Sequence, residues 1–252
     1  MNYVEYGKEN KYDDDIFFQK YSQMSRSQQG LAGAGEWETL RKLLPDFKDK
    51  RVLDLGCGYG WHCIYAMEHG ASSVVGVDIS HKMLEVAKEK THFPQVEYKC
   101  CAIEDVEFPE ESFDVILSSL AFHYVADYEI LVKKIYRILK SGGKLVFTVE
   151  HPVFTAYGTQ DWYYNKKGEI LHFPVDNYYY EGKRTAVFLG EKVTKFHRTL
   201  TTYLNTLLSN GFIINHIVEP QPPEYMMDIP GMQDEMRRPM MLIVSANKKV
   251  DR

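Results

Sequence analysis

Apolar residues recur along the chain in short runs separated by amphipathic stretches. The short runs predict buried strands at 51–56, 73–79, 96–101, 113–119, 142–150, 212–219 and 240–248. Stretches with a period near 3.6 residues predict helices at 61–70, 80–90, 127–140 and 199–210. Ser80 and Asp127 stand where N-caps are expected. This alternation predicts a doubly wound α/β fold with a seven-stranded, mostly parallel sheet and helices on both faces.

The segment before the first predicted strand has a different pattern. Helical spacing occurs at 15–24 and again at 36–44, where Pro45 follows. The glycine-containing sequence SRSQQGLAGAG separates these two stretches and predicts a flexible joint. We therefore expect residues 1–48 to form a helical cap on a single domain that spans residues 1–252.

Residues 151–198 interrupt the alternation of strands and helices. Eleven of the 34 Phe, Tyr and Trp residues of the chain fall within this segment of 48 residues. Aromatic residues favour strands, so the segment predicts hairpins inserted after the fifth strand. An insert at that point emerges at the carboxyl edge of the sheet, which predicts a lid that takes part in substrate recognition.

Composition and charge exclude several classes of protein. The hydrophobic fraction is 44%, the charged fraction is 26% and the net charge is −5, with no block of Lys or Arg. These values fit a folded globular protein and make nucleic acid a poor expectation as partner. No run approaches the roughly 20 apolar residues that cross a bilayer, and the polar N-terminus predicts a cytoplasmic protein without a membrane span. The four cysteines lack zinc-type spacing, so we expect reduced thiols and no metal site.

The turn after the first predicted strand carries the clearest chemical signal. It reads Asp54-Leu-Gly56-Cys-Gly58-Tyr-Gly60-Trp61. In open α/β sheets ligands bind beyond the carboxyl ends of the strands, and glycines let a ligand lie against bare backbone. A dinucleotide fingerprint would place its third glycine at Trp61, where it would allow the helix to approach a pyrophosphate. The indole therefore disfavours a nicotinamide-dependent oxidoreductase.

An acidic residue follows at the end of the second predicted strand. Asp78 lies 18 residues after Gly60, where a carboxylate can accept hydrogen bonds from both hydroxyls of a ribose. Together with the glycine turn, this residue predicts a ligand that has a ribose but no pyrophosphate.

Four segments together resemble the class I S-adenosylmethionine-dependent methyltransferases, in the branch that includes ubiquinone and menaquinone biosynthesis enzymes. They are VLDLGCGYG, VVGVDIS, SFDVILSSLAFHYV and LKSGGKLVF, and the likeness covers roughly residues 50–150 and 196–219. The resemblance implies a Rossmann-like methyltransferase fold. It also implies transfer of a methyl group from S-adenosylmethionine to a small-molecule acceptor by in-line displacement, with S-adenosylhomocysteine as product.

The resemblance also implies which residues contact the cofactor. They are Asp54, Gly56, Cys57, Gly58, Gly60, Asp78, Ile79, Met83, Ala102, Ile103, Glu104, Ser119 and Leu120. By position, the glycine turn lines the methionine portion and Asp54 reaches its amino group directly or through water. Asp78 holds the ribose, while Ile79 and Met83 pack on the two faces of the adenine.

One position departs from the family pattern. Where relatives carry an aspartate that accepts from the adenine amino group, this chain has Ala102. Backbone groups at Ala102 and Ile103, or the side chain of Glu104, are the expected substitutes. Ser119 and Leu120 are expected to border the sulfonium.

Two histidines are candidate bases for a hydroxyl acceptor. His123 follows the fourth predicted strand, and His151 follows the fifth. Each can equally be a structural histidine whose ring is hydrogen-bonded to the backbone. Two alternative functions stay open at this point: a regulatory protein that binds S-adenosylmethionine without turnover, and an RNA methyltransferase. A homodimer is a further expectation.

Overall fold

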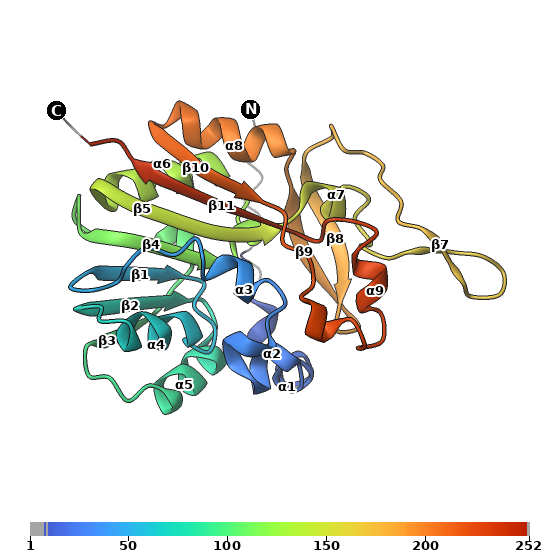
Figure 1. Ribbon diagram of the computed structural model, residues 1–252, viewed down its shortest axis with the longest axis horizontal. Coiled ribbons are helices and arrows are strands. Elements are labelled where there is room, and N and C mark those ends of the chain that lie inside the picture. Colours follow the sequence, from blue (N-terminus) through green and yellow to red (C-terminus); the bar gives the residue numbers. More distant parts are fainter. Residues whose placement is uncertain (1–7, 9, 251–252) are drawn as a thin grey trace.

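The computed structural model describes residue 8 and residues 10–250, so the start of the predicted cap, residues 1–7 and 9, lies outside the described residues. Its centre is a seven-stranded sheet in the order β10-β11-β5-β4-β1-β2-β3 (Figure 1). The strands are β1 (Arg51–Leu55), β2 (Ser73–Asp78), β3 (Val96–Cys100), β4 (Phe113–Ser119), β5 (Leu139–Glu150), β10 (Phe212–Val218) and β11 (Met241–Lys248). Strands β1 to β5 pair in parallel, and β11 is antiparallel to both β5 and β10. The predicted mostly parallel, doubly wound sheet is confirmed.

Helices cover both faces of the sheet. They include α3 (Trp37–Leu40), α4 (Trp61–Glu68), α5 (His81–Lys90), α6 (Tyr128–Ile138) and α8 (Leu200–Ser209). Buried side chains of α3, α4 and α5 share one core cluster with Val52 of β1, whereas those of α6 and α8 share a second cluster with Leu53. Since neighbouring strand residues point to opposite faces, the sheet separates two cores.

The expected helix starts are confirmed in detail. Ser80 accepts a hydrogen bond from the Met83 N–H through its side chain, and Asp127 accepts one from the Ile130 N–H. These bonds satisfy backbone donors that have no partner within the helix. They fix where α5 and α6 begin relative to the strand ends.

Several predicted helices are shorter than expected, two of them by more than two residues. The helix expected at 127–140 ends at Ile138, because Leu139 already pairs with Phe113 as the first residue of β5. The helix expected at 36–44 is helical only as α3, and turns occupy most of the residues before Pro45. A proline disfavours helical backbone in the residue before it, which limits the helix from its C-terminal side.

The N-terminal segment folds as a series of short helices. These are η1 (Lys11–Asp13), α1 (Asp15–Ser22), α2 (Ser25–Gln28) and η2 (Gly30–Gly33). Two of them occupy the stretch expected to be a flexible joint, so that expectation is wrong. Asp13 accepts hydrogen bonds from the Ser80 hydroxyl at 2.6 Å and the Lys82 N–H at 3.1 Å. The segment is therefore attached to the start of α5, at the ligand-binding edge of the sheet (Figure 1).

The insert after β5 contains the predicted hairpins. It consists of α7 (Pro152–Thr155), the hairpin β6 (Tyr163–Tyr164) with β7 (Ile170–His172), and the hairpin β8 (Gly182–Phe188) with β9 (Glu191–His197). The β6–β7 hairpin projects away from the sheet (Figure 1). The β8–β9 hairpin packs inward, with Ala186 and Val193 fully or almost fully buried against Phe17 of α1.

The chain after β10 packs against this insert. It includes η5 (Glu224–Met226) and α9 (Met232–Glu235). The Arg238 guanidinium, just after α9, lies 4.5 Å from the ring centre of Phe154, 4.7 Å from Phe173 and 4.9 Å from Trp162. These cation–π contacts hold the insert against the C-terminal segment. Within residues 8 and 10–250, no helix is long and apolar enough to cross a membrane.

Candidate active site

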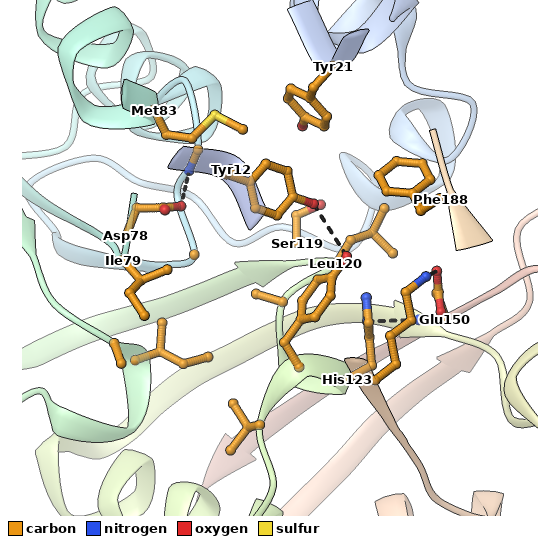
Figure 2. A pocket seen from close by; sticks show the side chains of 18 of the residues that line it. Tyr12, Tyr21, Asp78, Ile79, Met83, Ser119, Leu120, His123, Glu150 and Phe188 are labelled. Carbon is orange, nitrogen blue, oxygen red and sulfur yellow. Dashed lines mark hydrogen bonds and ion pairs between the residues drawn. The ribbon is translucent and has the colours of Figure 1, made fainter. Parts of the chain in front are cut away.

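A cavity of about 230 Å³, here called the main cavity, opens at the carboxyl ends of the strands. The residues that end or directly follow β1, β2, β4 and β5 contribute Gly56, Asp78, Ser119 and Glu150 to its wall. Residues of the N-terminal helical segment, among them Tyr21, close the opposite side (Figure 2). Short turns η3 (Ile103–Asp105) and η4 (Phe122–Tyr124) complete the wall.

The main cavity brings together most of the residues predicted from the sequence. Its wall includes Gly56, Gly58, Asp78, Ile79, Met83, Ala102, Ile103, Glu104, Ser119, Leu120 and His123. Four predicted residues do not line it, namely Asp54, Cys57, Gly60 and His151. Of these four, Cys57 borders a second cavity described below, and Asp54, Gly60 and His151 line neither cavity.

Asp78 holds the glycine turn in place. One carboxylate oxygen accepts from the Gly58 N–H at 2.8 Å, and the other accepts from the Ser80 N–H at 2.9 Å. Burial raises the pKa of Asp78, although the hydrogen bonds from Ser80 and Gly58 act in the opposite direction. Each oxygen retains a free lone pair, so the carboxylate can accept further hydrogen bonds from a ligand.

The three glycines of the turn have different surroundings. A Cβ added at Gly58 would meet nothing within 4 Å, whereas at Gly56 it would lie 2.4 Å from the Ala121 Cβ. At Gly60 it would lie 2.2 Å from the Tyr98 hydroxyl oxygen. All three have positive φ, which favours glycine. Gly60 therefore serves the packing of the turn, while Gly58 leaves open space at the cavity wall.

Cys57 borders a second, smaller cavity of about 80 Å³. This second cavity shares Gly56, Gly58 and Arg26 with the main cavity, so the two are neighbours across the glycine turn. The Arg26 guanidinium donates to both oxygens of the buried Glu36, at 3.0 and 3.2 Å. The positively charged Arg26 guanidinium therefore lies where the glycine turn and the N-terminal segment meet.

Asp54 lies beneath the turn and is only 1% exposed. Its Oδ2 accepts a hydrogen bond from the Cys63 thiol at 3.5 Å, and its Oδ1 has no partner among the described residues. Burial raises the pKa of Asp54 to about 7. Asp54 therefore lies under the glycine turn, and its Oδ1 can still accept a hydrogen bond.

The wall at the start of α5 and at η3 is largely apolar. Ile79 and Met83 line the main cavity near Asp78 (Figure 2). Ala102 and Ile103 belong to the same wall. Met83 is 2% exposed, so its side chain is fixed by packing. Apolar side chains of this kind suit packing against a flat ring.

The end of β4 is held in an unusual conformation. Leu120 has φ +54°, a value uncommon for a residue with a branched side chain. Its N–H donates to the Thr148 Oγ1 and also to the Thr148 carbonyl oxygen, both at 3.0 Å. Strained backbone of this kind is typical of functional sites, and Leu120 lines the main cavity.

The two histidines differ in position. His123 lines the main cavity, and its Nδ1 accepts from the Glu150 N–H at 3.4 Å (Figure 2). Burial lowers the pKa of His123 to about 4. His151 instead caps α7, with its Nδ1 accepting from the Val153 N–H, and its Nε2 lies 2.9 Å from Glu219. Only His123 is placed to touch a ligand in the main cavity.

Several cavity residues have no signal in the sequence. Tyr12 and Tyr124 face each other with their hydroxyl oxygens 3.4 Å apart. Lys195 of β9 forms an ion pair with Glu150 and donates to Gln160 Oε1 at 2.8 Å. Only Glu150 could have been suspected, because it ends a parallel strand at the ligand-binding edge. Within the described part of the chain, no group of three or more Cys, His, Asp or Glu residues could hold a metal ion.

The comparisons with known proteins agree with this geometry. A family model described as a methyltransferase domain matches residues 53–147. A solved structure from Listeria monocytogenes, assigned as an S-adenosylmethionine-dependent methyltransferase, is 57% identical and covers 87% of this chain and 99% of its own, with a TM-score of 0.84. An S-adenosylmethionine-dependent methyltransferase from Mesorhizobium loti is 41% identical over 86% of this chain and 100% of its own, with a TM-score of 0.80.

A curated relative matches a shorter part of the chain. The ubiquinone biosynthesis O-methyltransferase of Coxiella burnetii is 36% identical over 112 residues, which are 44% of this chain and 47% of that enzyme. The two solved structures match over nearly their whole length, and the first is more than half identical. The chain therefore belongs to the S-adenosylmethionine-dependent methyltransferases, as its motifs predict, and S-adenosylmethionine is its methyl donor.

Proposed function

We propose that this methyltransferase transfers its methyl group to a small-molecule acceptor bound in the main cavity. The observation that carries the proposal is the composition of one continuous wall. Its first part contains the ribose-type acid Asp78 and the open glycine Gly58. Its second part contains the aromatic residues Tyr12 and Phe188 and the ion pair of Glu150 with Lys195. The first part suits the cofactor and the second leaves room for a separate ligand.

The residues present fit the cofactor. Asp78 has lone pairs for the two ribose hydroxyls, and the apolar side chains of Ile79 and Met83 suit the adenine. Gly58 leaves bare backbone on the side of the methionine portion. Arg26 supplies a cation for a carboxylate at that end, and the free Oδ1 of Asp54 can accept from an amino group through water.

The chain's own contribution to the reaction is alignment and exclusion of water. The cofactor supplies a methyl group on a positively charged sulfur, so the leaving group is already activated. Tyr12, Tyr21 and Tyr124 cover the cavity and keep water from the reacting atoms. The rigid turn at Leu120 fixes the distance between the two ligands. Positioning of this kind accounts for much of the rate in a two-substrate reaction.

The nature of the acceptor is supported by charge and by similarity. The chain carries a net charge of −5, which disfavours an RNA substrate. The Coxiella relative is named as a ubiquinone biosynthesis O-methyltransferase, which supports a small organic acceptor. The homodimer and the cytoplasmic location stay predictions from the sequence.

The test uses cofactor labelled in its methyl group. The protein is incubated with a cell extract divided into a small-molecule fraction, an RNA fraction and a protein fraction. We expect label in the small-molecule fraction, and the Asp78→Ala variant should lose that transfer. Label confined to RNA would instead favour an RNA methyltransferase, and an absence of label from all three fractions would contradict the proposal.

A further inference from the structure

The wall of the main cavity opposite the glycine turn contains two buried charges. Lys195 is 3% exposed in its side chain and Glu150 is 15% exposed, and the two form an ion pair. Gln160 joins them, since its amide nitrogen donates to Glu150 Oε2 at 2.6 Å and its oxygen accepts from Lys195. Both oxygens of Glu150 therefore already have donors from the protein.

Lys195 has a donor left over. An ammonium group carries three N–H bonds, and the described residues offer it two acceptors, Glu150 Oε1 and Gln160 Oε1. The nitrogen lies 5.5 Å from the ring centre of Phe188 and 6.0 Å from that of Tyr124. All of these residues except Gln160 line the main cavity. The remaining N–H is thus available to a ligand that lies among aromatic rings.

His123 adds a second donor to the same wall. Its Nδ1 accepts from the Glu150 N–H, so the neutral ring carries its proton on Nε2. In this tautomer the Nε2 atom donates and cannot remove a proton from an acceptor. This part of the wall therefore offers the Lys195 ammonium and the His123 Nε2–H as donors, and both oxygens of Glu150 already bind protein donors.

We propose that Lys195, with His123 beside it, binds the ionised oxygen of a planar, largely apolar acceptor. This inference rests on the proposed function and gives it a substrate class, a phenol- or enol-type oxygen acid. A carboxylate on a flat ring presents the same chemistry and is distinguished in the test. A cationic amine would meet the Lys195 ammonium at short range, and such like-charge contacts are unfavourable.

Methyl transfer to the ionised oxygen needs no base from the protein. The acceptor hydroxyl loses its proton to solvent as it binds, because Lys195 stabilises the oxyanion. The oxygen lone pair then forms the bond to the methyl carbon while the sulfur–methyl bond breaks and its electron pair stays on sulfur. The products are a neutral methyl ether and S-adenosylhomocysteine.

The test uses 4-nitrophenol as an optical probe, because only its phenolate absorbs strongly in the visible range. The protein is saturated with S-adenosylhomocysteine at a pH where most of the free probe is neutral. We expect added wild-type protein to increase the phenolate absorbance. Lys195→Met should remove the increase and weaken binding of the probe by about tenfold or more. Lys167→Met, at an exposed lysine of the β6–β7 turn, should match the wild type.

Two further variants separate binding from a structural role. Glu150→Gln leaves the N–H donors of Lys195 in place and removes the Glu150 carboxylate, which competes with a bound phenolate for the Lys195 ammonium. The phenolate absorbance should therefore persist or increase. Should Lys195→Met fold poorly because Glu150 is left unpaired, the double variant Lys195→Met, Glu150→Gln removes both charges and should also lack the signal. Equal loss of the signal in folded Glu150→Gln and folded Lys195→Met would overturn the proposal, since the pair would then act only as scaffold.

Competing ligands identify the chemistry. 4-Nitrobenzoate displacing the probe more effectively than other phenols would assign the oxyanion to a carboxylate, and the reverse would assign it to a phenol. Displacement by neutral 4-nitroanisole as effective as by either anion would overturn the proposal. Calorimetry with S-adenosylhomocysteine distinguishes a failure of this inference from a failure of the proposed function. Cofactor binding without any phenolate signal refutes this inference alone, whereas no cofactor binding refutes the proposed function.

Discussion

The carboxylate of Asp78 accepts a hydrogen bond from the backbone N–H of Gly58 at 2.8 Å. This bond joins the end of β2 to the turn after β1, across 20 residues of sequence. The acid expected to bind the ribose also fixes the turn expected to bind the methionine portion. The two motifs form one unit, so a change in either should affect the binding of the whole cofactor.

Replacing Asp78 by Ala should weaken binding of S-adenosylhomocysteine by about 1.5–3 kcal/mol, or ten- to over a hundredfold, because charge-assisted hydrogen bonds are lost. The affinity of Asp78→Asn for S-adenosylhomocysteine should lie between those of the wild type and Asp78→Ala, since the amide retains one acceptor oxygen. Titration calorimetry gives the dissociation constants. The exposed Asp176 offers a control, as Asp176→Ala removes a carboxylate outside the cavity. Unchanged affinity in Asp78→Ala would refute the ribose assignment.

Gly58→Val should abolish cofactor binding while the protein stays folded. The added side chain would occupy open space at the cavity wall and would strain a residue whose φ is +52°. Gly168→Val is a matched control, because Gly168 also has positive φ and open surroundings but lies in the β6–β7 turn. Both variants should lose similar stability in a denaturant titration, about 1–2 kcal/mol. Retained binding in Gly58→Val would mean that the glycine serves only the turn.

Protein stability should fall in acid partly because of His123. Its pKa is lowered to about 4 by burial, so between pH 6.5 and 4 the unfolded chain binds a proton that the folded chain does not. Stability therefore decreases as pH falls through this window, by about 2 kcal/mol at pH 5 relative to neutral pH. His123→Asn keeps an acceptor for the Glu150 N–H and should reduce the difference in unfolding free energy between pH 7.5 and pH 5 by that amount. Parallel curves for variant and wild type would contradict the assignment.

Cofactor binding should also slow hydrogen exchange in the N-terminal segment. Tyr12, Tyr21 and Met24 line the main cavity, so a ligand there would favour the closed arrangement of η1, α1 and α2. The β6–β7 hairpin lines neither cavity described here and provides an internal reference. Mass spectrometry of peptides from both regions, with and without S-adenosylhomocysteine, makes the comparison. Equal protection in both regions, or none in either, would contradict a covering role for the segment.

Local patterns were enough to predict the sheet and the alternating helices, whereas the resemblance to methyltransferases supplied most of the predicted residues that line the main cavity. Ser80 and Asp127 are typical cap residues, and each caps the helix that the periodicity predicted. Gly58 and Asp78 follow directly from the strand ends, because parallel strands bring their carboxyl ends to one edge. The glycine motif alone does not show that Gly60 packs against Tyr98 while Gly58 faces the cavity. That distinction depends on packing between elements.

The acceptor side of the cavity could not be predicted in the same way. Lys195 meets Glu150 across 45 positions, and this depends on where the β8–β9 hairpin docks. Of the eleven aromatic residues of the insert, only Phe188 lines the main cavity. Phe154, Trp162 and Phe173 instead surround Arg238, a contact that no periodicity indicates. The composition of the insert predicted hairpins, but tertiary contacts decide which of its residues face the ligand.

The most direct test of the account is a crystal structure of the protein grown with S-adenosylhomocysteine. We expect density for the ligand in the main cavity, with both ribose hydroxyls within hydrogen-bond distance of the Asp78 carboxylate and the adenine between Ile79 and Met83. The sulfur should face the space before Lys195 and His123. Density elsewhere on the protein, or a ribose that does not contact Asp78, would contradict the account.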